Sequence, residues 1–256
     1  LLSMGKGLIP LTSMFFMIGC AGTAPNEGLS LSERLKLGMD YLDEKKYLQA
    51  QDEYNIVLMR ATGTELGDDA QFFLGESYFL NKEYILAIAE YEKLTRKMGF
   101  SPFVEKARFR ICDAYRLDSP KYFHDQTYTE KALEKFQEFV DDFPNSEYNA
   151  TALESMELLR DKLAKKLYET GILYLKMDEY EPARLSFQRV LDQYYDTNIV
   201  EQVHVGILKS YCLEIDIVKA RDYWSDHSGQ IESEELIAEV ENLITSAEEK
   251  KARLEK

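Results

Sequence analysis

The sequence has few of the features that indicate β-structure. Asn-Gly and Asp-Gly pairs, which favour the tight turns of β-hairpins, do not occur in its 256 residues, and segments in which Val, Ile or Thr alternate with polar residues are rare. Hydrophobic residues still make up 45% of the chain, which is enough to form a substantial core. We therefore expect an all-α protein.

Positive charge is also in deficit. The chain has 31 Lys and Arg residues against 46 Asp and Glu residues, so its formal net charge is −15, and this charge repels a nucleic-acid backbone. No stretch of basic residues interleaved with aromatic residues offsets it. We expect no nucleic-acid partner.

Motifs of catalytic, metal-binding and cofactor sites are absent from the sequence. It contains no His-Glu-x-x-His, Cys-x-x-Cys or Gly-x-Ser-x-Gly motif and no glycine-rich phosphate loop. The histidines, His124, His204 and His227, are scattered, and none has a second His or Cys at ligand spacing. We expect neither an enzyme nor a metal site, and no cofactor.

A repeated pattern is present instead. Residues 74–94 read LGESYFLNKEYILAIAEYEKL, and the same arrangement of small and large residues recurs in residues 37–57 and 170–190. In each copy a Gly is followed by Tyr at +3 and +9, Ala at +12 and an aromatic residue at +16. Such agreement between three copies is not chance. The glycines of the three copies are Gly38, Gly75 and Gly171.

This pattern predicts pairs of short antiparallel helices, because the apolar residues within each half of a copy have helical spacing. The glycine on the first helix leaves room for the second helix, and Ala50, Ala87 and Ala183 do the same on the second helix. The pattern resembles the tetratricopeptide repeat, although the Trp position of that repeat is unoccupied. The resemblance implies a helical solenoid of about five helix pairs.

Two further copies are less regular. One has Cys112 at the glycine position and Tyr115 after it, but its second helix follows only after a longer segment, so residues 118–128 are expected to form a protruding loop. The last copy keeps Tyr211 and Ala220 but lacks the glycine, as terminal repeats often do. Between the third and fourth pairs, residues 146–175 keep helical apolar spacing without Pro or Gly before Gly171, which predicts one unusually long helix.

Residues 1–30 differ from the rest of the chain. A lone Lys6 precedes an apolar run, residues 8–18, which is too short to span a bilayer and is typical of a signal-peptide core. The run leads into Gly19-Cys20, which resembles the bacterial lipoprotein cleavage site Leu-x-Gly/Ala-Cys with Met17 in the Leu position. The resemblance implies removal of residues 1–19 and acylation of Cys20 on its sulfur and its new amino group. An ordinary secretory signal is the alternative.

These patterns divide the chain into five parts. Residues 1–19 are a signal peptide and 20–30 a lipidated Cys with a polar tether. Residues 31–142 contain repeats 1 to 3, residues 143–234 the long helix with repeats 4 and 5, and residues 235–256 a solvated, capping helix. The other two cysteines, Cys112 and Cys212, belong to different repeats, so we expect buried free thiols and no disulfide.

The lipoprotein cysteine, the five repeats and the long helix together resemble the BamD family of lipoproteins in the outer-membrane β-barrel assembly machinery. The most specific part is residues 124–180, and the resemblance extends over residues 31–224, with Phe143 in place of the family's Tyr. It implies a non-catalytic scaffold on the periplasmic face of the outer membrane, working with other assembly lipoproteins. The C-terminal half would contact the periplasmic POTRA domains of the barrel-forming assembly protein, and the N-terminal half would receive unfolded outer-membrane-protein segments.

The repeat register also predicts where such a segment binds. First helices of this repeat line the concave face, and we expect an exposed apolar strip there that ends at an arginine placed to meet a terminal carboxylate. The alternative is that a tightly wound superhelix buries the same side chains against neighbouring repeats. The residues of the strip are Leu35, Met39, Leu42, Phe72, Phe79, Phe109 and Arg116.

Two other functions are compatible with parts of the sequence. Another periplasmic tetratricopeptide lipoprotein, serving pilus or cell-wall assembly, would share the repeats but should lack the long helix. An enzyme with a helical accessory domain would need a catalytic segment, for which this length leaves no room.

Overall fold

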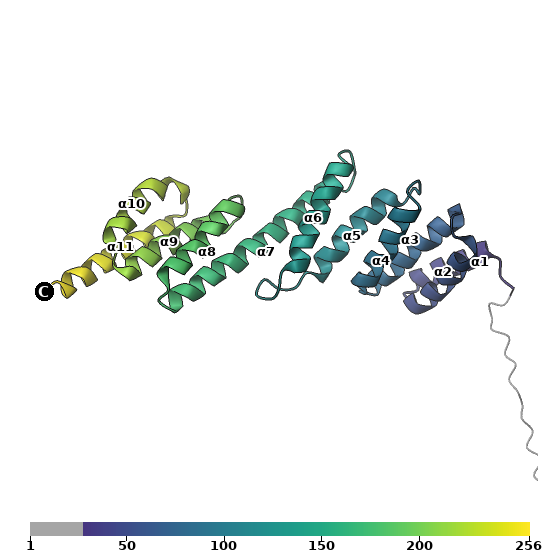
Figure 1. The fold of residues 1–256 in the computed structure, drawn as a ribbon, viewed down its shortest axis with the longest axis horizontal. Coiled ribbons are helices and arrows are strands. Elements are labelled where there is room, and N and C mark those ends of the chain that lie inside the picture. The colour runs from purple at the N-terminus through teal and green to yellow at the C-terminus, as the bar shows by residue number, and fades with distance from the viewer. Residues whose placement is uncertain (1–27) are drawn as a thin grey trace, which may run out of the picture.

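A computed structural model of the protein describes residues 28–256, and within this range the chain forms α-helices and one short 3₁₀ helix but no strand. The helices follow one another in an elongated row from α1 to α11 (Figure 1). The predicted all-α solenoid is confirmed. The helices are α1 Leu31–Asp43, α2 Tyr47–Ala61, α3 Glu65–Leu80, α4 Tyr84–Lys97, α5 Val104–Asp118, α6 Thr127–Asp142, α7 Asn149–Lys176, α8 Tyr180–Gln193, α9 Val200–Glu214, α10 Ile217–His227, η1 Ser228–Gln230 and α11 Glu234–Leu254.

Consecutive helices pack against each other as antiparallel pairs, α1 with α2 through α9 with α10. Four of the five pairs turn in the same way, because the residue seven positions after the glycine position adopts a left-handed conformation with φ of 60° to 64°. Equivalent turns at equivalent positions show that the repeat register read from the sequence is right. The four turn residues are Lys45, Lys82, Asp178 and Ile215.

The repeat glycines lie beneath aromatic rings of the second helix. A Cβ atom on Gly75 would lie 2.5 Å from Cε1 of Tyr91, a ring that is fully buried. Gly75 therefore leaves room for the second helix, as expected, and the side chain that takes this room is Tyr91. The same relation joins Gly38 to Tyr54 and Gly171 to Phe187.

The fifth pair shows the packing that results when the glycine is missing. Leu208 occupies the glycine position and is fully buried, together with Ala220 from α10. Trp224, at the aromatic position, is only partly buried against this cluster. A leucine at the glycine position therefore coincides with an aromatic residue that is less buried than in the regular pairs.

Residues 119–126 join α5 to α6, where a longer connection is expected. This loop does not stand free, because the side chains of α7 hold it. Lys162 Nζ donates to Ser119 Oγ at 2.8 Å, and Lys166 Nζ donates to the carbonyl of His124 at 2.9 Å. The predicted loop is present, but it lies against the middle of α7, with Phe123 60% exposed.

Helix α7 has 28 residues and is the predicted long helix. Its first half packs against α6 through Ala152 and Leu159, in the cluster that also holds the side chains of repeats 2 and 3. Its second half packs against α8 and α9 through Ala164 and Leu175 in a separate cluster. One helix therefore belongs to both halves of the solenoid.

The last helix, α11, packs against α9 and α10 and covers the end of the row. Val240, Ile244 and Ala247 are its buried residues. In the part of the chain that the structure describes, no helix is both long and apolar enough to cross a bilayer.

Cys112 and Cys212 are buried free thiols, as expected. The Cys112 sulfur lies 3.1 Å from the carbonyl of Lys135 on α6, close enough to donate a hydrogen bond. Burial raises the pKa of the Cys112 thiol to about 12 and that of Cys212 to about 11. Both therefore act as small apolar side chains.

Candidate binding surfaces

The expected apolar strip on the concave face is mostly buried. Met39 and Leu42 are half-buried against the core of repeat 1. The alternative expectation, burial against neighbouring repeats, is the arrangement that the structure has. The fully covered members are Leu35 at 7%, Phe72 at 1%, Phe79 at 8% and Phe109 at 8% exposed.

Residues of the following repeat cover the aromatic side chains of the strip. The Phe103 ring stacks on Phe72 with a centroid distance of 4.5 Å and an interplanar angle of 11°. Arg110 places its guanidinium 4.6 Å from the centroid of Phe79. Each ring is thus part of the contact between repeats, and it is not available to a ligand.

A polar cluster takes the place of the strip between repeats 2 and 3. Arg110 on α5 donates to both carboxylate oxygens of Glu76 on α3, at 2.7 and 2.9 Å. Tyr91 on α4 donates its hydroxyl to the same carboxylate at 2.5 Å, and burial followed by the charge of Glu76 raises the pKa of this tyrosine. Glu76 is 7% exposed, so this cluster is a fixed structural link between two repeats.

Arg116, the charged member of the strip, is also partly accessible, with a side chain 33% exposed. It pairs with Asp113 one turn earlier, where its Nε donates to Oδ1 at 2.8 Å. Lys162 of α7 lies nearby, and burial together with the charge of Arg116 lowers the pKa of this lysine. Two cations from different helices therefore face the same region beside the 119–126 loop, which suits an anionic group.

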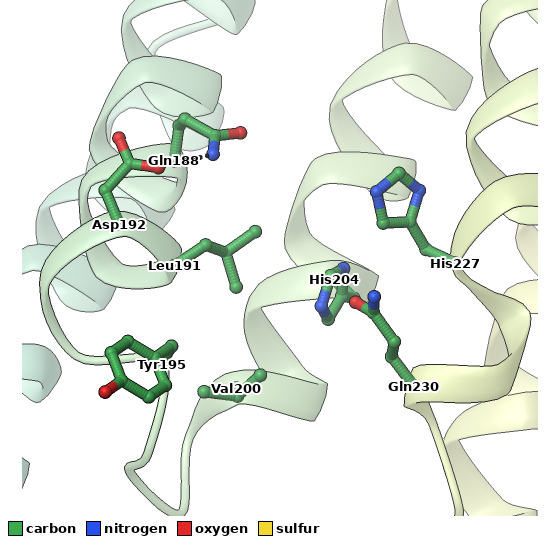
Figure 2. A pocket seen from close by; sticks show the side chains of 8 residues that line it. All are labelled: Gln188, Leu191, Asp192, Tyr195, Val200, His204, His227 and Gln230. Carbon is green, nitrogen blue, oxygen red and sulfur yellow. Dashed lines mark hydrogen bonds between the residues drawn. The ribbon is translucent and has the colours of Figure 1, made fainter.

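The C-terminal half contains a cavity of about 480 Å³ between α8 on one side and α9, α10 and η1 on the other. Figure 2 shows the imidazoles of His204 and His227 on one side of it and the side chains of α8 on the other. Tyr195 at its rim is 72% exposed. The lining residues are Gln188, Leu191, Asp192, Tyr195, Val200, His204, His227 and Gln230.

Both cavity histidines contact the same tyrosine of α10. His204 Nδ1 lies 2.8 Å from the hydroxyl of Tyr223, while the His227 ring stacks on the Tyr223 ring at 4.0 Å. Burial, and then the charge of His227, lower the pKa of His204 to about 4, so this imidazole is neutral at physiological pH. Within residues 28–256 no group of three or more His, Cys, Asp and Glu side chains is arranged to hold a metal ion.

His204 and His227 are scattered in the sequence, but their rings lie 5.3 Å apart in the fold. The antiparallel pairing of the two helices in a repeat indicates this proximity, because the first turns of one helix lie beside the last turns of the other. His204 is near the start of α9 and His227 is the last residue of α10, so the register brings them together. The other predicted site residue, Cys20, lies outside the described residues.

Comparison with known proteins gives a consistent result. A family model described as YfiO, outer membrane lipoprotein, matches residues 30–221. A protein of Rickettsia prowazekii named outer membrane protein assembly factor BamD is 27% identical over 183 residues, which is 69% of this chain and 70% of that protein. Proteins of the same name from Caulobacter vibrioides and Neisseria gonorrhoeae are each 24% identical, over 75% and 78% of this chain and 65% and 81% of their own lengths. The chain therefore belongs to the YfiO family of outer membrane lipoproteins and is a lipid-anchored protein of the outer membrane.

Proposed function

We propose that this protein is a non-catalytic scaffold of outer-membrane protein assembly on the periplasmic face of the membrane. The observation that carries the proposal is the family match over residues 30–221, which spans both halves of the solenoid and the long helix between them. Relatives with the name of an assembly factor match over 69% and 75% of the chain. In this role the protein binds the barrel-forming assembly protein and unfolded outer-membrane-protein segments, alongside other assembly lipoproteins.

The anchor in this proposal is Cys20, acylated after removal of residues 1–19. Several acyl chains on one residue give stable attachment where a single chain is marginal. Replacing Cys20 with Ala is expected to leave an uncleaved precursor or to release soluble protein. A fully processed Cys20→Ala protein that still fractionates with the outer membrane would contradict this assignment.

The C-terminal half is the proposed contact for the POTRA domains of the barrel-forming protein. Its support is the cavity between α8 and α10, which is lined by His204, a hydrogen-bond partner of Tyr223, and rimmed by the exposed Tyr195. Exposed tyrosines beside a pocket are typical of binding hot spots. A Tyr195→Ala substitution is expected to weaken the association, while Leu254→Ala, at an exposed site in the last turn of α11, leaves it unchanged.

The N-terminal half is the proposed receiver of unfolded segments, and Arg116 and Lys162 are its anion-binding residues. A terminal carboxylate would accept hydrogen bonds from both cations, which are already close enough to repel each other. We expect Arg116→Gln to reduce crosslinking to a peptide with a free C-terminus and to have no effect on the amidated peptide, whose terminal charge is missing. Equal loss for both peptides would count against the carboxylate contact.

The decisive experiment is purification of the tagged protein from detergent-solubilised outer membrane. The proposal predicts that the barrel-forming assembly protein is recovered in stoichiometric amount. Recovery of pilus or cell-wall assembly components without the barrel protein would reject the proposal and favour a different periplasmic scaffold.

A further inference from the structure

Phe100 is the most exposed large apolar side chain of residues 28–256, with a relative exposure of 107%. It lies in the connection between α4 and α5, next to Gly99. Its ring makes no aromatic contact within the described part of the chain. Met98 and Phe103, which lie on either side of it, pack into the core, whereas the Phe100 side chain is exposed to solvent.

The loop around Phe100 is a built turn. Met98 on one side is 7% exposed in the core, and the amide of Ser101 donates back to the Met98 carbonyl at 2.9 Å. Phe103 on the other side packs its ring on Phe72. Since both flanks of the turn are fastened to the core, the Phe100 side chain is held outward.

Basic residues flank this phenylalanine in the sequence. The segment of residues 93–106 contains four Lys or Arg residues and one Glu, in a chain whose net charge is −15. Arg96 and Lys97, directly before the turn, are exposed, and neither has an ion-pair partner within 4 Å in the described residues. The next turn of this edge, residues 61–69, carries acidic residues, so the positive charge is local to the α4–α5 turn.

The position of this turn relative to the anchor follows from the topology. Because consecutive helices run in opposite directions, the start of α1 and the end of α4 lie at the same edge of the solenoid. Helix spacings of about 10 Å place the turn on the order of 20 Å from the start of α1. Gly28 is eight positions after Cys20, and a chain of eight residues reaches at most about 29 Å.

We propose that the α4–α5 turn is a second membrane contact, in which Phe100 inserts at the lipid interface and Arg96 and Lys97 bind anionic phospholipid headgroups. An aromatic side chain flanked by cations suits a bilayer interface. Insertion of the ring and attraction of the cations to anionic headgroups both strengthen the attachment that the acyl chains provide. The inference depends on lipid anchoring at the N-terminal edge and goes beyond the proposed scaffold role. The contact would hold this edge of the solenoid against the membrane.

The test uses the full lipidated protein in vesicles that contain brominated phosphatidylcholine and phosphatidylglycerol. The chain has a single tryptophan, Trp224, so the fluorescence of the unmodified protein provides a baseline. Phe100→Trp is compared with Phe123→Trp, a matched control at an exposed phenylalanine in a loop of the opposite edge. We expect a blue shift and loss of the added fluorescence at position 100 and neither change at position 123.

Equal quenching at the two positions, or none at position 100, overturns the inference. The double change Arg96→Glu and Lys97→Glu is expected to reduce quenching at position 100 when phosphatidylglycerol is present and to have less effect in its absence. Flotation of the same samples separates the proposals. If the protein floats but position 100 is not quenched, the lipid anchor is supported and the contact at the α4–α5 turn is rejected. If the protein does not float, both the anchor and this contact are rejected.

Discussion

Replacing Gly75 with Leu tests the packing of the repeats most directly. A Cβ atom there would lie 2.5, 2.7 and 3.0 Å from three ring carbons of Tyr91, against the ordinary contact of about 3.5 to 4.0 Å. The ring must therefore move by about 1 Å. It has little freedom to do so, because it is fully buried and its hydroxyl is bonded to Glu76, which also holds Arg110.

The expected magnitude follows from three contributions. Overpacking of a core destabilises by about 1–3 kcal/mol, and loss of the tyrosine hydrogen bond adds about 1 kcal/mol. Replacing a helical glycine stabilises the fold by about 1 kcal/mol, because the new residue has a higher helix propensity. The net destabilisation is about 1–3 kcal/mol for Gly75→Ala, with Gly75→Leu at the upper end or above it. For a chain of this size the melting temperature falls by roughly 2–4 °C per kcal/mol.

Thermal unfolding of a soluble form that begins at Gly28, followed by circular dichroism, measures the effect. Gly229→Ala is the control, since no atom lies within 4 Å of a Cβ atom placed there. In a double-mutant cycle, Tyr91→Leu is expected to relieve part of the damage of Gly75→Ala, with a coupling of about 1 kcal/mol or more. A melting temperature unchanged by Gly75→Leu, or additive effects of the two substitutions, would refute this account of the repeat.

Three further predictions concern polar and titrating groups. Glu76→Ala removes the bidentate partner of Arg110, which keeps Asp113 nearby, and is expected to destabilise by about 1.5–3 kcal/mol. Arg253→Ala, from an exposed pair, should leave the urea midpoint almost unchanged. His204 has a pKa of about 4 in the fold against its ordinary value of 6.5, so the unfolded chain takes up the proton first. The free energy of unfolding should fall by up to about 3 kcal/mol as pH drops from 6.5 to 4. The urea midpoint of His204→Gln should lack this pH dependence. A parallel decline of the midpoint in both proteins would contradict the assignment. Cys112, with its pKa raised to about 12, should react with a thiol reagent only after unfolding, and rapid labelling of the native protein would show that the thiol is accessible.

Much of the fold was predictable because it depends on local spacing. Helical apolar spacing within each half of a copy predicted the helix pairs, and the place of Cys112 at the small-residue position predicted its burial. The same apolar spacing, without Pro or Gly before Gly171, predicted the long helix. Each of these features follows from the local sequence.

The binding strip was not predictable in the same way. Whether Phe72 is exposed depends on Phe103, which reaches it from the next repeat, and whether Phe79 is exposed depends on Arg110. The superhelical winding determines such contacts, and the repeat pattern does not specify it. The same applies to the partner of Gly75, which the register placed on the second helix without distinguishing Tyr91 from Ala87.

The middle of α7 decides how the two halves are held relative to each other. The buried cluster that α7 shares with repeats 2 and 3 ends at Leu159 and the one that it shares with α8 and α9 begins at Ala164, so the helix itself connects these two clusters. At a rise of about 1.5 Å per residue it extends about 42 Å. Bonds from Lys162 and Lys166 to the 119–126 loop brace it on one side, and Arg160, paired with Asp196 at 2.6 Å, braces it on the other. Because the extra length of the third repeat supplies one of these braces, the irregularity in the repeat pattern contributes to the way the two halves are held on α7.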